Sequence, residues 1–214
     1  MSGTGSIHMG HGQMVDIVRR DGNQWEVMFS EAGVDVYKAP PLAEVELDAI
    51  DGEGRIHPLK VASSGSASSV LASGAVNGAY RVRVRVVHGN HFHTREALLP
   101  GAAAVPPKTG PQGGSLAKLG AADSVEIKRL DDERWELIFA SNGAARSAPA
   151  PDNVVVQAIG PRAEDYQIRN LTTQPGENAS TLVASGKIKD ATYARISIKT
   201  DTGTEIRSVP IVAA

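Results

Sequence analysis

The sequence predicts an all-β protein made of two tandem immunoglobulin-like β-sandwich domains that are related by an internal repeat. Three observations lead to this prediction: short segments of alternating apolar and polar residues, turn residues about every 8–12 positions, and a pattern that occurs twice. Alternation with a period of two places the apolar side chains on one face of a strand, where a core can cover them. No segment shows a helical period over three or four turns.

The internal repeat is clearest around the two tryptophans. Residues 13–29 (QMVDIVRRDGNQWEVMF) match residues 123–139 (DSVEIKRLDDERWELIF), with Trp25 aligned on Trp135. Each segment consists of an alternating stretch, a polar turn and a second alternating stretch. Because the tryptophans recur at equivalent places, we expect each of them to anchor the core of its own domain.

The match resumes further along each copy. Residues 70–74 (VLASG) correspond to residues 182–186 (LVASG). The segment Tyr80–Leu99 corresponds to Tyr193–Val212, so the tyrosines that open these two segments are predicted to be equivalent and structural. Both segments are predicted to form a hairpin, that is, two strands joined by a tight turn.

Domain boundaries follow from the position of the repeats. Residues 43–50 and 153–159 are further alternating strands, each entered from a Pro-rich corner. Residues 100–114 (PGAAAVPPKTGPQGG) are rich in Pro, Gly and Ala, which is typical of a linker. We therefore predict a first domain at residues 8–99 and a second at residues 115–214.

Composition excludes several classes of function. The formal net charge of −2 gives no reason to expect nucleic acid or an acidic membrane as a partner. The sequence has no cysteine, so disulfides and thiolate sites are excluded. No run approaches the roughly 18 apolar residues of a membrane span, and we expect no membrane insertion. A signal peptide is absent from the N-terminus, as it would also be from an exported protein after processing.

Catalytic motifs are lacking. The sequence contains no nucleophile-elbow motif, no paired acidic motif, no Walker loop and no dinucleotide fingerprint. Serines are concentrated in residues 63–69 (SSGSASS), which is the composition of a loop. We therefore predict that the protein is not an enzyme.

Three of the six histidines lie in the first hairpin, and all six are in the first half of the chain. Gly89-Asn90 suits a two-residue turn of type II′. That turn would set His88 opposite His91, and His93 would share their side because side chains alternate along a strand. Three imidazoles would then converge, which suits a divalent ion held at about 2.0–2.1 Å by nitrogen.

A different turn length would change this set of ligands. A three-residue loop would place Phe92 on the valine face, move His91 and His93 to the arginine face, and leave His88 outside the cluster. The two-residue turn, in contrast, puts Arg95 on the apolar face. These histidines could also be ordinary exposed turn residues, and the arginines that alternate with the valines are expected to form a solvated strand face.

A second group of candidate ligands lies near the N-terminus. His8, Met9 and His11 supply two imidazoles and a thioether. Imidazole with thioether suits copper, and imidazole alone suits zinc, nickel or copper. A histidine-methionine pair after a Gly/Ser leader is also typical of a cloning junction. The predicted metal ligands are His88, His91, His93, His8 and His11, and His57 is expected to be a bystander.

Residues 8–41 (HMGHGQMVDIVRRDGNQWEVMFSEAGVDVYKAPP) resemble the N-terminal His/Gly-led β-domain of bacterial periplasmic heavy-metal efflux adaptor subunits and related metal-handling proteins. The shared outline is a His-Gly lead, a strand, a strand ending in an apolar-aromatic pair, and a Val-Tyr segment followed by proline. The resemblance implies an exported, metal-associated sandwich in which His8 and His11 match the lead. The chain lacks the coiled-coil hairpin and the lipoyl-like parts of a full adaptor.

Two functions are compatible with these observations. The first is a non-catalytic periplasmic metal-binding protein for copper, zinc or nickel, involved in heavy-metal homeostasis or efflux, with an efflux or other protein as its partner. The alternative is a structural or adhesion-type tandem β-sandwich module that binds a protein or a glycan. The alternative predicts dispensable histidines and a contiguous exposed apolar or aromatic patch.

Overall fold

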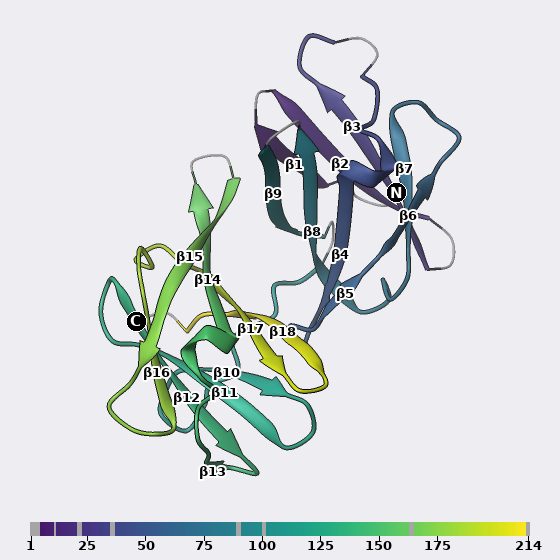
Figure 1. Ribbon diagram of the computed structural model, residues 1–214. Coiled ribbons are helices and arrows are strands. Elements are labelled where there is room, and N and C mark those ends of the chain that lie inside the picture. The colour runs from purple at the N-terminus through teal and green to yellow at the C-terminus, as the bar shows by residue number, and fades with distance from the viewer. Residues whose placement is uncertain are drawn as a thin grey trace. The chain divides into compact units, whose positions relative to one another are not determined.

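The structure, a computed structural model, describes residues 5–10, 12–20, 23–34, 37–88, 91–99, 102–162 and 165–212. Over these residues the chain is built from antiparallel β-strands and two short 3-10 turns, η1 (Leu42–Glu44) and η2 (Pro151–Asn153). It forms two compact units, one mainly from the residues before Val105 and one mainly from that residue onward (Figure 1). The prediction of an all-β protein is confirmed.

The first unit has two sheets. The first sheet has the order β1 (Gly5–Gly10), β2 (Gln13–Arg20), β3 (Gln24–Glu31), β7 (Ser69–Ser73), β6 (Lys60–Ser63). The second has the order β5 (Ile56–Pro58), β4 (Val45–Asp51), β8 (Ala79–His88), β9 (His91–Leu98). Both sheets contribute to one apolar core, in which Trp25 is buried among valines of β4, β7 and β8.

The second unit has one continuous path of strands. The order is β10 (Ser115–Leu119), β11 (Asp123–Arg129), β12 (Arg134–Ser141), β16 (Thr181–Ser185), β15 (Asp165–Pro175), β14 (Val154–Arg162), β17 (Tyr193–Thr200), β18 (Gly203–Pro210), and β13 (Ala144–Ala145) pairs with β12. The end strands meet, because Arg207 Nε of β18 donates to the Lys118 carbonyl of β10 at 2.7 Å. This sheet therefore nearly closes into a barrel.

The two units share one strand order. Strands β5 and β6 together occupy the place of β15, and every other strand of the first unit has a single counterpart. In the first unit Leu59 separates β5 from β6, whereas β15 runs without interruption for 11 residues. The continuous β15 joins the two halves of the second unit, which explains why one unit has two sheets and the other has one.

The repeat also extends to the pairing register. The pair Val15–Phe29 of the β2–β3 ladder becomes Val125–Phe139 of the β11–β12 ladder, with the same shift that relates the two tryptophans. All four side chains are buried. The repeated alternation around the tryptophans therefore places the same positions in both cores.

One predicted equivalence is wrong by a residue. Val82 of β8 and Ala194 of β17 each pair with the alanine at the fifth position of their partner strand, so these two residues are equivalent. Tyr193 therefore corresponds to Arg81 and not to Tyr80. Both tyrosines lie at the start of an alternating segment, so the sequence pattern aligned them with each other. The β4–β8 ladder has a register shift between Ile50 and Asp51, which the sequence does not indicate.

The glycines that end the repeated VLASG and LVASG segments have a steric role. Gly74 and Gly186 have φ angles of +146° and +153°, which L side chains rarely adopt. A Cβ at Gly74 would lie 3.1 Å from Leu59 Cδ2, and one at Gly186 would lie 2.7 Å from Leu171 Cδ2. Because these residues are glycines, the chain can pass close to a buried leucine, Leu59 or Leu171, at the point where β7 or β16 ends.

The second half of the predicted linker is folded onto the second unit. The carboxylate of Glu126, which is buried, accepts hydrogen bonds from the backbone amides of Gln112 and Gly114 at 2.8 and 2.7 Å. The amide of Gly110 donates to the Gly114 carbonyl at 2.8 Å. A buried carboxylate needs such donors, so this contact fastens the loop to β11.

Within the described ranges, no helix is long and apolar enough to cross a membrane.

Candidate functional site

The β8–β9 hairpin has the register of a two-residue turn. Its ladder pairs His88 with His91 and Val86 with His93, and Arg95 lies opposite another core valine. The alternative with a three-residue loop is therefore wrong. The predicted turn residues, Gly89 and Asn90, lie outside the described residues.

The five predicted ligands are described to different extents. His11 lies outside the described residues, and for His88 and His91 the description covers the backbone and not the side chain. His8 is exposed and His93 is half-buried. Among the described residues, no group of three or more His, Cys, Asp or Glu side chains is placed to hold a metal ion.

The two histidine-bearing segments, which lie far apart in the sequence, meet at one edge of the first unit. A Cβ at Gly10 of β1 would lie 3.9 Å from both Cε1 and Nδ1 of His93 on β9, and 3.7 Å from Nη2 of Arg95. Figure 1 shows β1 and β9 in the first unit, where they end the two sheets. The ring of His93 therefore lies close to the end of β1.

The side chains of β1 are sorted by the alternation of the strand. Ile7 and Met9 are buried in the core, and His8 between them is exposed. The backbone carbonyl of His8 accepts a hydrogen bond from Arg95 Nε of β9 at 3.2 Å. The thioether of Met9, which is 2% exposed, is part of the core and not a soft ligand on the surface.

The arginines of β8 are paired with acidic residues of the neighbouring strands. The ion pairs are Arg85 with Glu46 at 2.6 Å, Arg83 with Asp48, and Arg81 with Glu96. The expectation of a solvated face is wrong for Arg81, which is 1% exposed. The sequence signal that could have revealed the ladder is the alternating Glu46 and Asp48 of the strand that pairs with β8.

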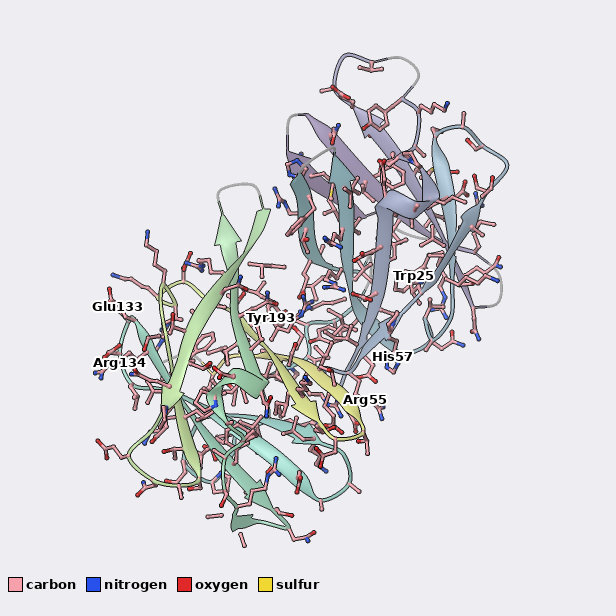
Figure 2. All side chains as sticks on the ribbon, viewed as in Figure 1. Trp25, Arg55, His57, Glu133, Arg134 and Tyr193 are labelled. Atoms are coloured by element: carbon pink, nitrogen blue, oxygen red, sulfur yellow. The ribbon has the colours of Figure 1, made fainter. Side chains whose placement is uncertain are left out.

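His57, predicted to be a bystander, is held in place. Its Nε2 lies 2.9 Å from Oδ2 of Asp51, across the turn between β4 and β5. Figure 2 labels His57, the middle residue of β5. Asp51 and His57 are six positions apart in the sequence, and their contact stabilises the turn that connects β4 and β5. The contact therefore has a local structural explanation.

Exposed apolar side chains occur on several elements. In the described part of the chain, the large ones are Val34, Leu42, Phe92, Leu98, Leu130 and Val155. Phe92 is the most exposed, at 59%, and the guanidinium of Arg85 lies 4.3 Å from the centre of its ring. Such a contact is a cation–π interaction, which partly covers the ring.

No protein-family model matches the sequence, and comparison with curated proteins gives no significant match. The function is therefore inferred from the residues and their geometry.

Proposed function

We propose that this chain is a non-catalytic, exported metal-binding protein whose ion site lies at the end of the β8–β9 hairpin. The observation that supports it is the ladder register, in which the positions of His88 and His91 are opposite each other and His93 follows two residues later. Opposite positions in an antiparallel pair have Cβ atoms about 4.5–5.5 Å apart, and positions two apart share a face. A single ion can bridge side chains at that spacing.

The ligand chemistry is that of imidazole. Met9 is buried in the core, so the thioether that would have favoured monovalent copper is not offered to the surface. A set of imidazoles binds Zn²⁺, Ni²⁺ or Cu²⁺. Two or three histidines leave coordination positions for water or for a group from a partner, as a protein that passes an ion onward requires.

The second unit provides support by contrast. In the equivalent β17–β18 ladder, the places of the three hairpin histidines are occupied by Thr200, Gly203 and Glu205. The frame is shared and the histidines are not. This difference favours a specific role for the histidines of the first unit over a role in folding, because the second unit forms the same hairpin without them.

The cellular role that we propose is heavy-metal homeostasis or efflux in the periplasm, with an efflux protein as the partner. It is supported by the resemblance of residues 8–41 to the β-domain of efflux adaptors and related proteins. We also propose that each unit is an immunoglobulin-like sandwich, with domains at residues 8–99 and 115–214. The single core of each unit and the shared strand order support this assignment.

Calorimetric titration of the tag-free chain with Zn²⁺, Ni²⁺ and Cu²⁺ tests the proposal. We expect one ion per chain with a dissociation constant below about 0.1 mM for at least one of them. Replacing both His91 and His93 with alanine should abolish this binding. The control is His57→Ala, because His57 lies on a different turn and should not affect affinity.

Two results would count against a metal site. Absence of binding by the unmodified chain would end the proposal. Binding that is unchanged in the double alanine variant would move the site elsewhere, and would favour the alternative of a structural or adhesion module with dispensable histidines.

A further inference from the structure

We propose that Arg95 is the positioning residue of this corner: it fastens strand β1 to strand β9 and thereby fixes the place of His93. The inference rests on the proposed metal site and adds the residue that holds its geometry. Arg95 Nε donates to the His8 carbonyl at 3.2 Å, and Nη2 donates to the Met9 carbonyl at 3.4 Å. Nη1 donates to the carbonyl of Thr94, its own neighbour, at 3.0 Å.

Strands β1 and β9 have no ladder between them. Each is an end strand, β1 of the first sheet and β9 of the second. An end strand presents backbone carbonyls without a ladder partner on its open side. The guanidinium of Arg95 supplies donors to these carbonyls, because one planar group with several N–H bonds can reach two of them at once.

A bulge in β1 makes two successive carbonyls available. In a regular strand, successive carbonyls point to opposite sides. The register of β1 shifts between His8 and Gly10, and Gly10 has a φ of +99°, a conformation that favours glycine. As a result, the carbonyls of both His8 and Met9 lie within reach of Arg95.

The position of Arg95 on the apolar side is explained by these bonds. Arg95 lies opposite Val84, which is buried in the core. A guanidinium on that side costs free energy unless its donors are satisfied. The carbonyls of β1 satisfy them, so the arginine can run along the open edge between the two sheets.

The second unit contains the same arginine. Arg207 lies opposite Ile196, its Nε donates to the Lys118 carbonyl at 2.7 Å, and its Nη1 donates to the Ile206 carbonyl at 2.9 Å. These are the counterparts of the Arg95 contacts with His8 and Thr94. We call this arginine, Arg95 in one unit and Arg207 in the other, the edge arginine.

The residue beside the edge arginine is what differs between the units. In the second unit Glu205 has the position of His93, and its Oε2 lies 3.8 Å from Arg207 Nη2. A Cβ at Gly120 would lie 3.6 Å from Glu205 Oε1, as one at Gly10 would lie beside His93. Both units therefore place a glycine turn, an edge arginine and one further polar side chain together, and only the first unit places a histidine there.

Arg95 acts on the ion through position alone. A guanidinium remains protonated and cannot be a ligand. Without it, β1 loses two hydrogen bonds to β9, and the end of β1 near the His93 ring is no longer held in place. Loss of a residue that orients a metal ligand typically lowers metal affinity by about 10–100-fold.

Matched variants of the full chain test the inference, with Zn²⁺ alone as the probe. We expect Arg95→Gln to weaken Zn²⁺ binding by about tenfold. Arg207→Gln removes the corresponding contacts with the Lys118 and Ile206 carbonyls from the unit without histidines, so it should lower the unfolding temperature and leave Zn²⁺ affinity unchanged. Arg95→Lys keeps the charge and one donor group to β1, and should recover part of the affinity.

A second measurement does not depend on metal binding. In the metal-free protein, the imidazole resonances of His93 should shift in Arg95→Gln and stay in place in Arg207→Gln. Equal Zn²⁺ affinity of Arg95→Gln and the unmodified chain, or unmoved His93 resonances, would overturn the positioning role. If the unmodified chain binds no metal while the His93 resonances respond as expected, the positioning of His93 stands and the proposed metal site fails.

Discussion

At the scale of single residues, the glycines that close the repeated segments combine a positive φ with a close side-chain neighbour. Gly186 has a φ of +153°, and a Cβ there would lie 2.7 Å from Leu171 Cδ2. Gly203 has a similar φ of +143°, but nothing lies within 4 Å of its Cβ position. A comparison of Gly186 with Gly203 therefore distinguishes the cost of backbone strain, which both share, from the cost of steric overlap, which only Gly186 has.

We expect Gly186→Ala to lower the free energy of unfolding by about 3 kcal/mol and Gly203→Ala to lower it by about 1 kcal/mol. Both variants carry the strain of a positive φ, and only the first also pushes a methyl group against Leu171. Chemical denaturation of the two variants measures the difference. Equal losses would show that the core around Leu171 relaxes freely.

A second residue-scale prediction concerns pH. The hydroxyl of Ser69, which donates to Glu26 Oε1 at 2.7 Å, and the guanidinium of Arg20 hold the pKa of the Glu26 carboxyl below its ordinary value of 4.5. A carboxyl with a lowered pKa stabilises the fold above its ordinary pKa, and this contribution is lost as the pH falls through the lower value of the folded state. Ser69→Ala should therefore raise the pKa of Glu26 in an NMR titration. Ser66→Ala changes an exposed serine in the loop before β7; it is the control and should leave the pKa of Glu26 in place.

At the scale of elements, the ion pairs between β8 and its neighbours differ in burial. The Arg81 and Glu96 side chains are 2% and 1% exposed, whereas Glu46, the partner of Arg85, is 51% exposed. Breaking a buried pair leaves a charge without its partner in a region of low dielectric. An exposed pair is screened by water and contributes little.

We expect Glu96→Gln to lower the free energy of unfolding by about 3 kcal/mol, and Glu46→Gln to lower it by less than about 1 kcal/mol. Both substitutions keep the size of the side chain and remove the charge. Urea denaturation at neutral pH compares them. A loss for Glu46→Gln as large as that for Glu96→Gln would contradict the role assigned to burial.

Much of this element could be predicted from the sequence. The alternation of valine and arginine indicates a strand with one apolar face, and Gly89-Asn90 indicates the turn whose length sets the register. The pairing of the arginines could not be derived in the same way, because it requires knowing that β4 lies beside β8. The edge arginine is harder still, since Arg95 meets His8 only where the ends of two separate sheets come together.

At the scale of the whole chain, a ligand that binds the first unit should slow hydrogen exchange in that unit only. The proposed ligands all belong to that unit, and binding to the native state stabilises it by about 2.7 kcal/mol at a free metal concentration of about 100 times the dissociation constant. We expect hydrogen exchange to slow in β8 and β9 when Zn²⁺ is added and to remain unchanged in β17 and β18. Equal protection of the second hairpin would contradict a site confined to the first unit.

The duplication itself was visible in the sequence because core positions repeat with their spacing. The difference between two sheets and one nearly closed sheet was not, because it depends on whether a single segment stays extended. Leu59 and Leu171 occupy the same place beside a glycine, yet only the segment of Leu59 is divided into two strands. Local alternation does not decide between these outcomes.

The edge arginine also has a consequence for protein engineering. Since Arg207 already holds the corner of the second unit, introducing histidine at positions 200, 203 and 205 of that hairpin would reproduce the set of histidines of the first, at a cost of about 1 kcal/mol for the φ of +143° at position 203, which favours glycine. A chain modified in this way should bind two ions per molecule, one in each unit. The natural protein would then be one of several variants of the duplicated fold that differ in the number of ions they bind.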